Sequence, residues 1–177
     1  MKYIFSFFFA ILFCLPSRGQ QIIEDIGHYT QIGLPIAALG ISLAKGDKKG
    51  AIQLTKSFVV ETVLVQGLKR TINRRRPSGG KHSFPSGHTA VSFMSSTYLW
   101  KRYGWEYGVP ATVLASFVGY SRFGIQEPVH HFSDVVAGAL IGIGTSWLFT
   151  KSQEKDVELD VIGDTSFVGL NLKINLN

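Results

Sequence analysis

The segment KRTINRRRP (Lys69–Pro77) is followed along the chain by PSGH (Pro85–His88) and then by SRFGIQEPVHHFSD (Ser121–Asp134). These three blocks carry Lys, Arg, His and Asp side chains and a Ser-Gly turn. Phosphoryl transfer through a histidine needs these groups: cations hold the phosphate oxygens, one His attacks phosphorus, another protonates the leaving group, and a carboxylate orients the attacking ring. The sequence therefore predicts one phosphate-handling site built from three separate segments.

The third block supplies the predicted nucleophile. A neutral imidazole at His130 can attack phosphorus and form a phosphohistidine, which divides hydrolysis into two easier steps. Asp134 lies four residues later, where one helical turn brings its carboxylate to the other imidazole nitrogen. The second block supplies His88, which can protonate the leaving oxygen and later activate water. We therefore expect His130, His88 and Asp134 to be catalytic.

The predicted substrate-binding residues come from all three blocks. Lys69, Arg76 and Arg122 supply positive charge, and the planar guanidinium groups match phosphate oxygens in pairs. Gly87 allows the backbone to approach phosphate closely at the start of a helix, where backbone amides favour an anion. Ser86 can cap that helix and donate its hydroxyl to phosphate.

The spacing of the blocks resembles the signature of the type 2 phosphatidic acid phosphatase and vanadium haloperoxidase superfamily, which reads Lys-x6-Arg-Pro, Pro-Ser-Gly-His and Ser-Arg-x5-His-x3-Asp. The first two blocks match without change, whereas seven residues separate Arg122 from His130 in the third. This insertion leaves His131 as an alternative nucleophile, although the spacing to Asp134 favours His130. The resemblance implies a helical bundle with the blocks at one end, and hydrolysis of a phosphomonoester or pyrophosphate through phosphohistidine.

No cofactor is predicted. The sequence contains no HExxH motif, no paired-carboxylate metal cluster and no Gly-rich P-loop. Protein cations would then take the place of a metal at the phosphate, as the resemblance also implies. Two rival functions stay open: a vanadium-dependent haloperoxidase, and a non-catalytic phosphate- or lipid-binding protein of the cell envelope.

The N-terminus has the features of a secretory signal. Lys2 precedes the apolar run Ile4–Leu15, and small residues flank a predicted cleavage site before Gln20. The run is short of the ~20 residues that span a bilayer, and the alternative is an uncleaved anchor. Cys14 is the only cysteine, so a chain cut before Gln20 contains none. We expect export to the periplasm or cell envelope, which favours a lipid phosphate: phosphatidic acid, phosphatidylglycerol phosphate, undecaprenyl pyrophosphate or a lipid A phosphate.

The formal net charge is +6, with much of the excess between Lys69 and Lys81. Because Lys69 and Arg76 belong to the first block, this cluster favours an anionic substrate. Export of the chain argues against nucleic acid as a partner, and we expect a membrane surface instead. Arg70, Arg74 and Arg75 either attract anionic head groups or only solvate the loop. The sequence does not predict an oligomeric state.

The sequence predicts an all-α domain over residues 20–152, a bundle of about five to six helices, followed by a tail over residues 153–177. Apolar patterns and caps indicate helices at residues 31–45, 50–73, 86–103, 110–122 and 133–151. Alternating stretches at residues 157–162 and 166–176, with a turn at Gly163-Asp164, predict a C-terminal β-hairpin. We expect the apolar helices to be buried in a compact bundle, with a membrane-embedded bundle as the alternative.

Overall fold

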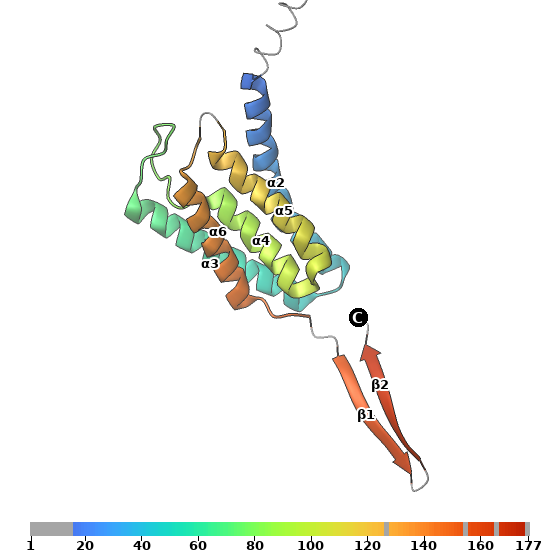
Figure 1. Cartoon of the computed structure of the whole chain (residues 1–177). Helices are drawn as coiled ribbons and strands as arrows, with labels where there is room; N and C mark the ends of the chain where they lie inside the picture. Colours follow the sequence, from blue (N-terminus) through green and yellow to red (C-terminus); the bar gives the residue numbers. More distant parts are fainter. Residues whose placement is uncertain (1–15, 126–127, 154–155, 165–166, 176–177) are drawn as a thin grey trace, which may run out of the picture.

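The computed structural model describes the backbone of residues 16–125, 128–153, 156–164 and 167–175, and the side chains of residues 19–125 and 128–153. The predicted signal segment comprises residues 1–19, and its part up to residue 15 lies outside these residues. The described chain is a helical bundle followed by a two-stranded hairpin (Figure 1). Its elements are α2 (Pro16–Ala44), α3 (Lys48–Ile72), α4 (Gly87–Tyr103), α5 (Trp105–Phe123), α6 (Phe132–Phe149), β1 (Asp156–Asp164) and β2 (Phe167–Asn175).

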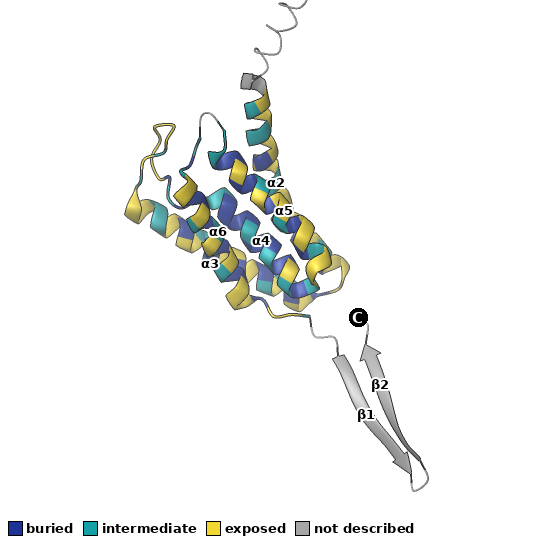
Figure 2. Ribbon diagram, viewed as in Figure 1, coloured by how far each residue is buried: buried dark blue, intermediate teal, exposed yellow. Residues whose placement is uncertain are grey.

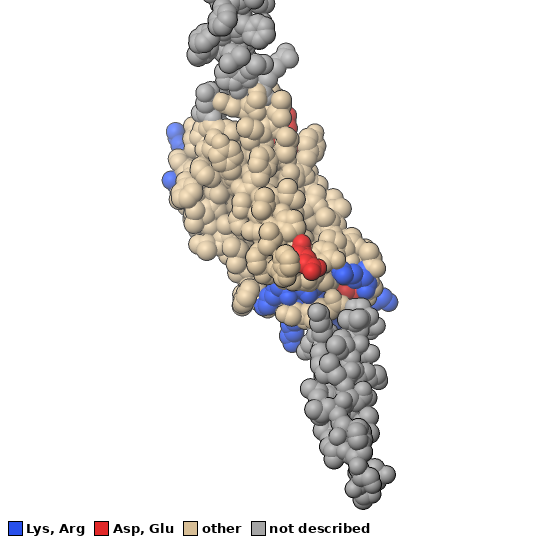
Figure 3. Space-filling view, turned by 45° about the vertical axis from the view of Figure 1, so that its right-hand side comes forward, with Lys and Arg blue, Asp and Glu red and all other residues tan. Residues whose placement is uncertain are grey.

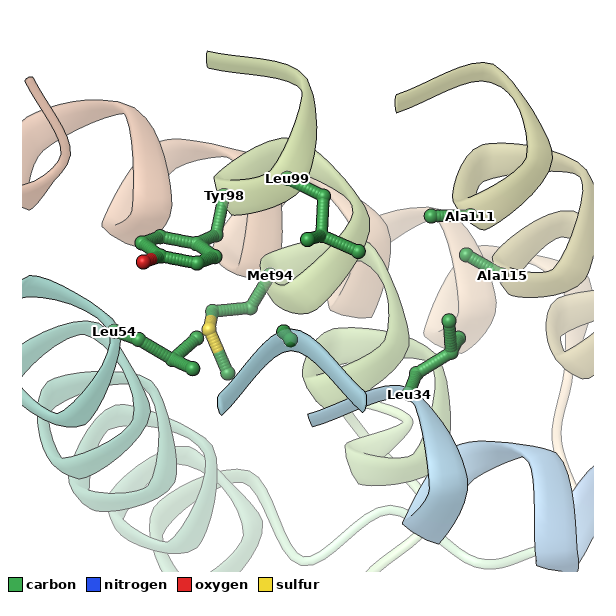
Figure 4. Close-up of a cluster of buried hydrophobic side chains, with 8 residues drawn as sticks. Leu34, Leu54, Met94, Tyr98, Leu99, Ala111 and Ala115 are labelled. Carbon is green, nitrogen blue, oxygen red and sulfur yellow. The ribbon is translucent and has the colours of Figure 1, made fainter. Parts of the chain in front are cut away.

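Helix α4 lies at the centre of the bundle, where it packs against α2, α3, α5 and α6. Its side chains are buried along most of its length, as the dark ribbon in Figure 2 shows. The apolar core joins α2, α3, α4 and α5 (Figure 4). Its members are Leu34, Ala38, Leu54, Met94, Tyr98, Leu99, Ala111 and Ala115.

Two glycines let α6 lie directly on α4. A Cβ atom added at Gly138 or Gly142 would collide with the carbonyl oxygens of Ser86 and Ala90 respectively. The close approach allows the amide of Ser86 to donate a hydrogen bond of 2.9 Å to the carbonyl of Asp134. Helix packing therefore fixes the second sequence block against the third.

A buried ion pair joins the start of α3 to the end of α4, at the end of the bundle away from these blocks. Asp47 caps α3 by accepting from the amide of Gly50 at 2.8 Å, as the sequence predicted. The Arg102 guanidinium donates two hydrogen bonds of 2.7 Å to the same carboxylate, and the Tyr103 hydroxyl donates a third. The bond from Arg102 lowers the pKa of Asp47 to about 2, which keeps the cap charged.

The helical fold is confirmed, but two helices are longer than predicted. α2 begins at Pro16 and continues past the predicted cleavage site before Gln20. The polar residues between Gln20 and Gln31 interrupt the apolar pattern, because several of them face a cavity and not the core. α5 begins directly after Gly104, so Pro110 lies inside the helix and not in its first turn.

The tail is a hairpin, with β1 antiparallel to β2. Gly163 pairs with Val168 and Asp164 pairs with Phe167, so the chain reverses after Asp164. The prediction of a hairpin is therefore confirmed, and the placement of its turn at Gly163-Asp164 is wrong by two residues.

The outer faces of the helices expose large apolar side chains. On α6 they follow helical spacing, with Phe132, Val136, Leu140 and Trp147 between 40% and 65% exposed. On the face drawn in Figure 3, the described Lys and Arg side chains gather toward the ends of the bundle. Within the described residues, α6 alone has the length and composition of a membrane span, and a third of it is buried. These faces depart from the expectation that the apolar helices are buried in a compact bundle.

Candidate active site

A cavity of about 580 Å³ opens at the end of the bundle where α3 ends and α4 begins. Six of the eight site residues predicted from the sequence line it. They are Lys69, Arg76, Gly87, His88, Arg122 and His130. The same cavity is lined by residues of α2, a helix outside the three sequence blocks.

Backbone hydrogen bonds join the loops and helix ends that carry the site. Each of these hydrogen bonds joins two segments that are separated along the sequence by a turn or a helix. They run from Ser83 N to Arg74 O (2.9 Å), from Ser86 N to Asp134 O (2.9 Å) and from His130 N to Arg122 O (3.1 Å). The site is therefore held by main-chain contacts that do not depend on a bound ligand.

The last of these bonds accommodates the two-residue insertion in the third block. α5 ends at Phe123, and the bond from His130 N to Arg122 O closes the loop that follows. His130 is 3% exposed and lines the cavity. The ring of His131 instead lies with Nε2 3.2 Å from the carbonyl of Arg75. The two neighbouring histidines thus point to different surroundings, and His130 is the one at the cavity.

A serine lies between His130 and the predicted orienting carboxylate. His130 Nδ1 and Asp134 Oδ2 are 3.7 Å apart, which is beyond hydrogen-bond distance. Ser83 is fully buried, and its Oγ donates to Asp134 Oδ2 at 2.5 Å while lying 3.4 Å from His130 Nδ1. An Nδ1–H of His130 can therefore reach Asp134 through the Ser83 hydroxyl. The sequence alone did not indicate Ser83, although it lies two residues before Pro85, where the second block begins.

The carboxylate of Asp134 is fully buried and held from several sides. Arg74 Nη1 donates to its Oδ1 at 2.8 Å, and the amide of His131 donates to its Oδ2 at 3.0 Å. Arg74 Nη1 also donates to Ser133 at 2.7 Å. The sequence left Arg74 as a lipid-facing or solvated residue, whereas the structure gives it a specific partner in the site.

The three predicted phosphate-binding cations differ in how far they are already engaged. Arg122 donates to the carbonyl of Glu24 at 2.6 Å, and Lys69 Nζ donates to the carbonyl of His82 at 3.0 Å. Burial, followed by the nearby charge of Arg76, lowers the pKa of Lys69 to about 8. The Arg76 side chain makes no hydrogen bond to a residue that the structure describes, so its guanidinium is available to a ligand.

The Pro-Ser-Gly turn contributes less side-chain chemistry than predicted. The Ser86 hydroxyl is buried and lies 3.0 Å from the hydroxyl of Thr89, and it does not line the cavity. Gly87 does line the cavity, and a Cβ atom there would lie 3.9 Å from Cε of Lys69. The turn therefore presents backbone at the start of α4, and the hydroxyl points elsewhere.

Burial keeps the imidazoles of His130 and His88 neutral near neutral pH. Burial first, and then the charges of Lys69 and Arg76, lower the pKa of His130 to about 4. Burial also lowers the pKa of His88 to about 4, and the positive charge of Arg122 is the next cause. A neutral imidazole retains the lone pair that a nucleophile needs.

Helix α2 adds side chains that sequence reasoning missed. Glu24, His28 and Gln31 line the cavity, and their spacing of four and three residues places them on one helix face. The recurrence of polar residues at helical spacing along this segment is the sequence signal that could have revealed them. The acid Glu61 of α3 also lines the cavity and is 1% exposed. Within the described chain, no three His, Cys, Asp or Glu residues lie close enough together to hold a metal ion.

Comparison with known proteins places these observations in a family. The model of the PAP2 superfamily matches residues 77–158. The lipid A 4'-phosphatase of Helicobacter pylori is 30% identical over 146 residues, which cover 76% of this chain and 72% of that protein. A lipid A 1-phosphatase of the same species is 29% identical, covering 72% of this chain and 70% of that protein.

A solved structure agrees with these sequence matches. The crystal structure of Aquifex aeolicus LpxE superposes with a TM-score of 0.54 at 26% sequence identity, covering 76% of this chain and 93% of that chain. The predicted helical fold and the family resemblance are thereby confirmed. The chain belongs to the PAP2 superfamily and is a lipid phosphatase of the PAP2 type.

Proposed function

We propose that this protein removes a phosphate group from a phosphorylated glycolipid of the lipid A class through a phosphohistidine on His130. The main observation behind this proposal is that His130 and His88 line one cavity together with three cations from three segments. In the first step His130 Nε2 attacks phosphorus, the bond to the ester oxygen breaks, and His88 gives that oxygen a proton. In the second step water attacks phosphorus, His88 takes a proton from that water, and the P–N bond to His130 breaks as phosphate is released.

Asp134 acts on His130 through Ser83. An Nδ1–H of His130 pointing at the Ser83 hydroxyl leaves the Nε2 lone pair free to attack, and the Ser83 hydroxyl in turn donates to the buried carboxylate. This arrangement holds the tautomer and stabilises the positive charge that forms on the ring. Arg74 and the amide of His131 keep the carboxylate in place.

Arg76, Arg122 and Lys69 bind the phosphate oxygens. Negative charge on these oxygens grows as phosphorus becomes five-coordinate, and fixed cations stabilise that state without reorganising. The backbone at Gly87 adds the positive end of α4 to the same region. Ser86 has no part in this step, because its hydroxyl is directed at Thr89.

Two observations support a glycolipid substrate. Beyond its cationic part, the cavity is lined by Gln31, Thr62 and Gln66 together with the acids Glu24 and Glu61, which can hydrogen-bond to the hydroxyl and amide groups of a sugar. The relatives from Helicobacter pylori are named as lipid A 1- and 4'-phosphatases.

The exposed apolar side chains of the helices support association with a membrane. Large apolar side chains are exposed on several helices, and on α6 they follow helical spacing, a pattern that favours contact with lipid or with another protein. The acyl chains of the substrate would remain in the lipid while the phosphate enters the cavity. Export of the chain to the periplasm or cell envelope through its N-terminal segment completes this proposal.

The test is phosphate release in EDTA by the full chain in detergent micelles. The substrates are lipid A with two phosphates, phosphatidic acid and a small aryl phosphate, and mass spectrometry of the lipid A product identifies which phosphate is lost. We expect release from lipid A by the native chain, none by His130→Ala, and retained release by His131→Ala.

Each other outcome has a definite meaning. Loss of activity in His131→Ala with activity retained in His130→Ala would make His131 the nucleophile. Preference for phosphatidic acid would reject the glycolipid substrate. No release from any substrate would reject the phosphatase proposal, and halide oxidation after loading with vanadate would then reveal a haloperoxidase.

A further inference from the structure

The predicted general acid, His88, is not alone at its end of the cavity. The Nδ1 atom of His28 on α2 lies 3.1 Å from the Nε2 atom of His88, and the ring centroids are 5.4 Å apart. Both rings line the cavity. His28 belongs to none of the three sequence blocks, so the family signature gives it no role.

Helix packing holds His28 in this position. Gly27 faces the end of α5 so closely that a Cβ atom there would collide with Ser121. One turn earlier, the carbonyl of Glu24 accepts the hydrogen bond from Arg122. The segment of α2 that carries His28 is therefore tied to the same helix end that supplies a phosphate-binding cation.

The contact assigns different surroundings to the two nitrogens of His88. Nε2 faces His28, whereas Nδ1 has no hydrogen-bond partner among the described residues. Since the described side chains contain no buried polar atom without a partner, Nδ1 is accessible from the cavity. Nδ1 of His88 can therefore give a proton to the substrate, whereas Nε2 of His88 can receive a proton from His28.

His88 needs such support, because its surroundings oppose a positive charge. It is largely enclosed, and Arg122 from α5, Arg76 from the loop after α3 and His130 from the loop before α6 act on it. The acids Glu24 and Asp25 of α2 and Glu61 of α3 line the same cavity. His28 is exposed to solvent and can exchange protons with it.

We propose that His28 is a proton-relay residue for His88. Resting on the proposed phosphatase reaction, the relay runs in two directions. As the ester bond breaks, His88 releases its Nδ1 proton to the leaving oxygen, and its Nε2 takes a proton from Nδ1 of protonated His28. When water attacks the phosphohistidine, His88 Nδ1 takes the proton from water, and the Nε2 proton returns to His28. Over one turnover neither ring gains or loses a proton.

This role predicts a dependence on the leaving group. An alkyl or sugar alkoxide is strongly basic and requires a proton as it departs, whereas an aryl oxide with an electron-withdrawing substituent departs as an anion. A defect in proton supply therefore slows the first kind of substrate and spares the second. A defect in packing or phosphate binding slows both kinds equally.

The experiment compares the native full chain with His28→Ala and His28→Gln in detergent micelles, using lipid A with two phosphates, an alkyl phosphate and p-nitrophenyl phosphate. We expect kcat for lipid A and the alkyl phosphate to fall by roughly tenfold or more, with kcat for p-nitrophenyl phosphate changed by less than about threefold. Added imidazole should restore part of the lost rate in His28→Ala, because the exposed position leaves room for it. Ile32→Ala, one turn along the exposed side of α2, is the control and should behave like the native chain.

Equal losses on all substrates without rescue by imidazole would show that His28 only supports packing. Unchanged rates in both variants would remove it from the reaction. A second measurement does not depend on turnover: nitrogen NMR of 15N-labelled histidine should find His88 protonated at Nδ1 in the native chain and shifted toward the Nε2 tautomer in His28→Ala. An unchanged His88 tautomer would overturn the relay even if the native chain hydrolysed none of the substrates, an outcome that by itself would reject only the phosphatase function.

Discussion

The Nδ1 atom of His130 and the Oδ2 atom of Asp134 lie 3.7 Å apart, too far for the hydrogen bond that their spacing in the sequence predicts. The hydroxyl of Ser83 lies between them and contacts both groups. The orienting carboxylate therefore reaches the proposed nucleophile through a third side chain, and that side chain comes from the loop before the second sequence block.

Ser83→Ala should lower kcat by about tenfold, the rate equivalent of one hydrogen bond worth about 1.4 kcal/mol, with little change in KM. The loss arises because His130 Nδ1 and Asp134 Oδ2 both lose their partner. Steady-state kinetics on lipid A measure the effect. Ser95→Ala, another fully buried serine whose hydroxyl only donates to the carbonyl of Val91, is the matched control. A native kcat in Ser83→Ala would mean that His130 and Asp134 close into direct contact once substrate binds.

Arg76→Met should lower kcat by roughly 100- to 1000-fold, as expected for the loss of one group that stabilises the transition state. Arg76 lines the cavity, and its guanidinium makes no hydrogen bond to any of the residues that the structure describes. Its neighbour Arg75 does not line the cavity, and Arg75→Met should change kcat by less than about threefold, within the small effects usual for surface substitutions. Similar losses in both variants would indicate that net charge near the membrane, and not a specific contact, governs the rate.

The acid limb of kcat/KM should follow a pKa of about 4, because that is the value to which burial lowers the pKa of His130. His130 is neutral and able to attack above this pH, and protonation below it removes the lone pair. The measurement is the pH profile of kcat/KM on p-nitrophenyl phosphate. An acid limb near the ordinary histidine pKa of about 6.5 would contradict a buried, neutral nucleophile.

The same shift has a consequence for stability. Between the ordinary histidine pKa and about 4, the unfolded chain binds protons at His130 and His88 that the folded chain does not bind. Stability should therefore fall as the pH drops through this window. Chemical denaturation of the native chain and of His130→Gln at pH 7 and pH 5 tests the sign, since the variant should lose less stability than the native chain.

Glu61→Gln should stabilise the protein at alkaline pH. Burial raises the pKa of Glu61 to about 7, so the folded state favours the neutral acid. Below the ordinary pKa of about 4.5 the carboxyl is neutral in both states, and above about 7 its ionisation costs the native chain about 3 kcal/mol. Denaturant unfolding at pH 8 should show the variant to be more stable, with the difference gone at pH 4. Equal stability at pH 8 would mean that the cavity solvates this carboxylate.

Local sequence patterns were sufficient for several elements of the fold. Asp47 predicts the start of α3, because a short acceptor side chain satisfies a free amide at a helix start. Gly104 predicts the end of α4, because glycine readily adopts the positive φ of 92° found there. The alternating apolar residues of the tail predict paired strands, because successive side chains of a strand point to opposite faces. Turn placement failed because pairing of Gly163 with Val168 is decided across the hairpin, not within the turn.

The spacing of residues within each block also identified most of the cavity. Lys69 lies in the last turn of one helix and Arg76 in the loop after it, His88 lies in the first turn of the next helix, and His130 precedes another. These helix ends come together at one end of the bundle once it forms. The sequence could not reveal that Ser86 turns toward Thr89, or that Arg74 and not a neighbouring arginine contacts Asp134. Those outcomes depend on where a side chain finds space and a partner after the helices have packed.

The sequence by itself determined the helical bundle, the terminal hairpin and the set of groups that handle phosphate, because capping, periodicity and motif spacing act over a few residues. Only the tertiary structure decided that the Ser83 hydroxyl contacts both His130 and Asp134, and that His28 contacts Nε2 of His88. The physical reason is that these contacts join residues 47 to 60 positions apart. They exist because helices approach closely where a glycine leaves room, as Gly138 of α6 does against α4 and Gly27 of α2 does against α5.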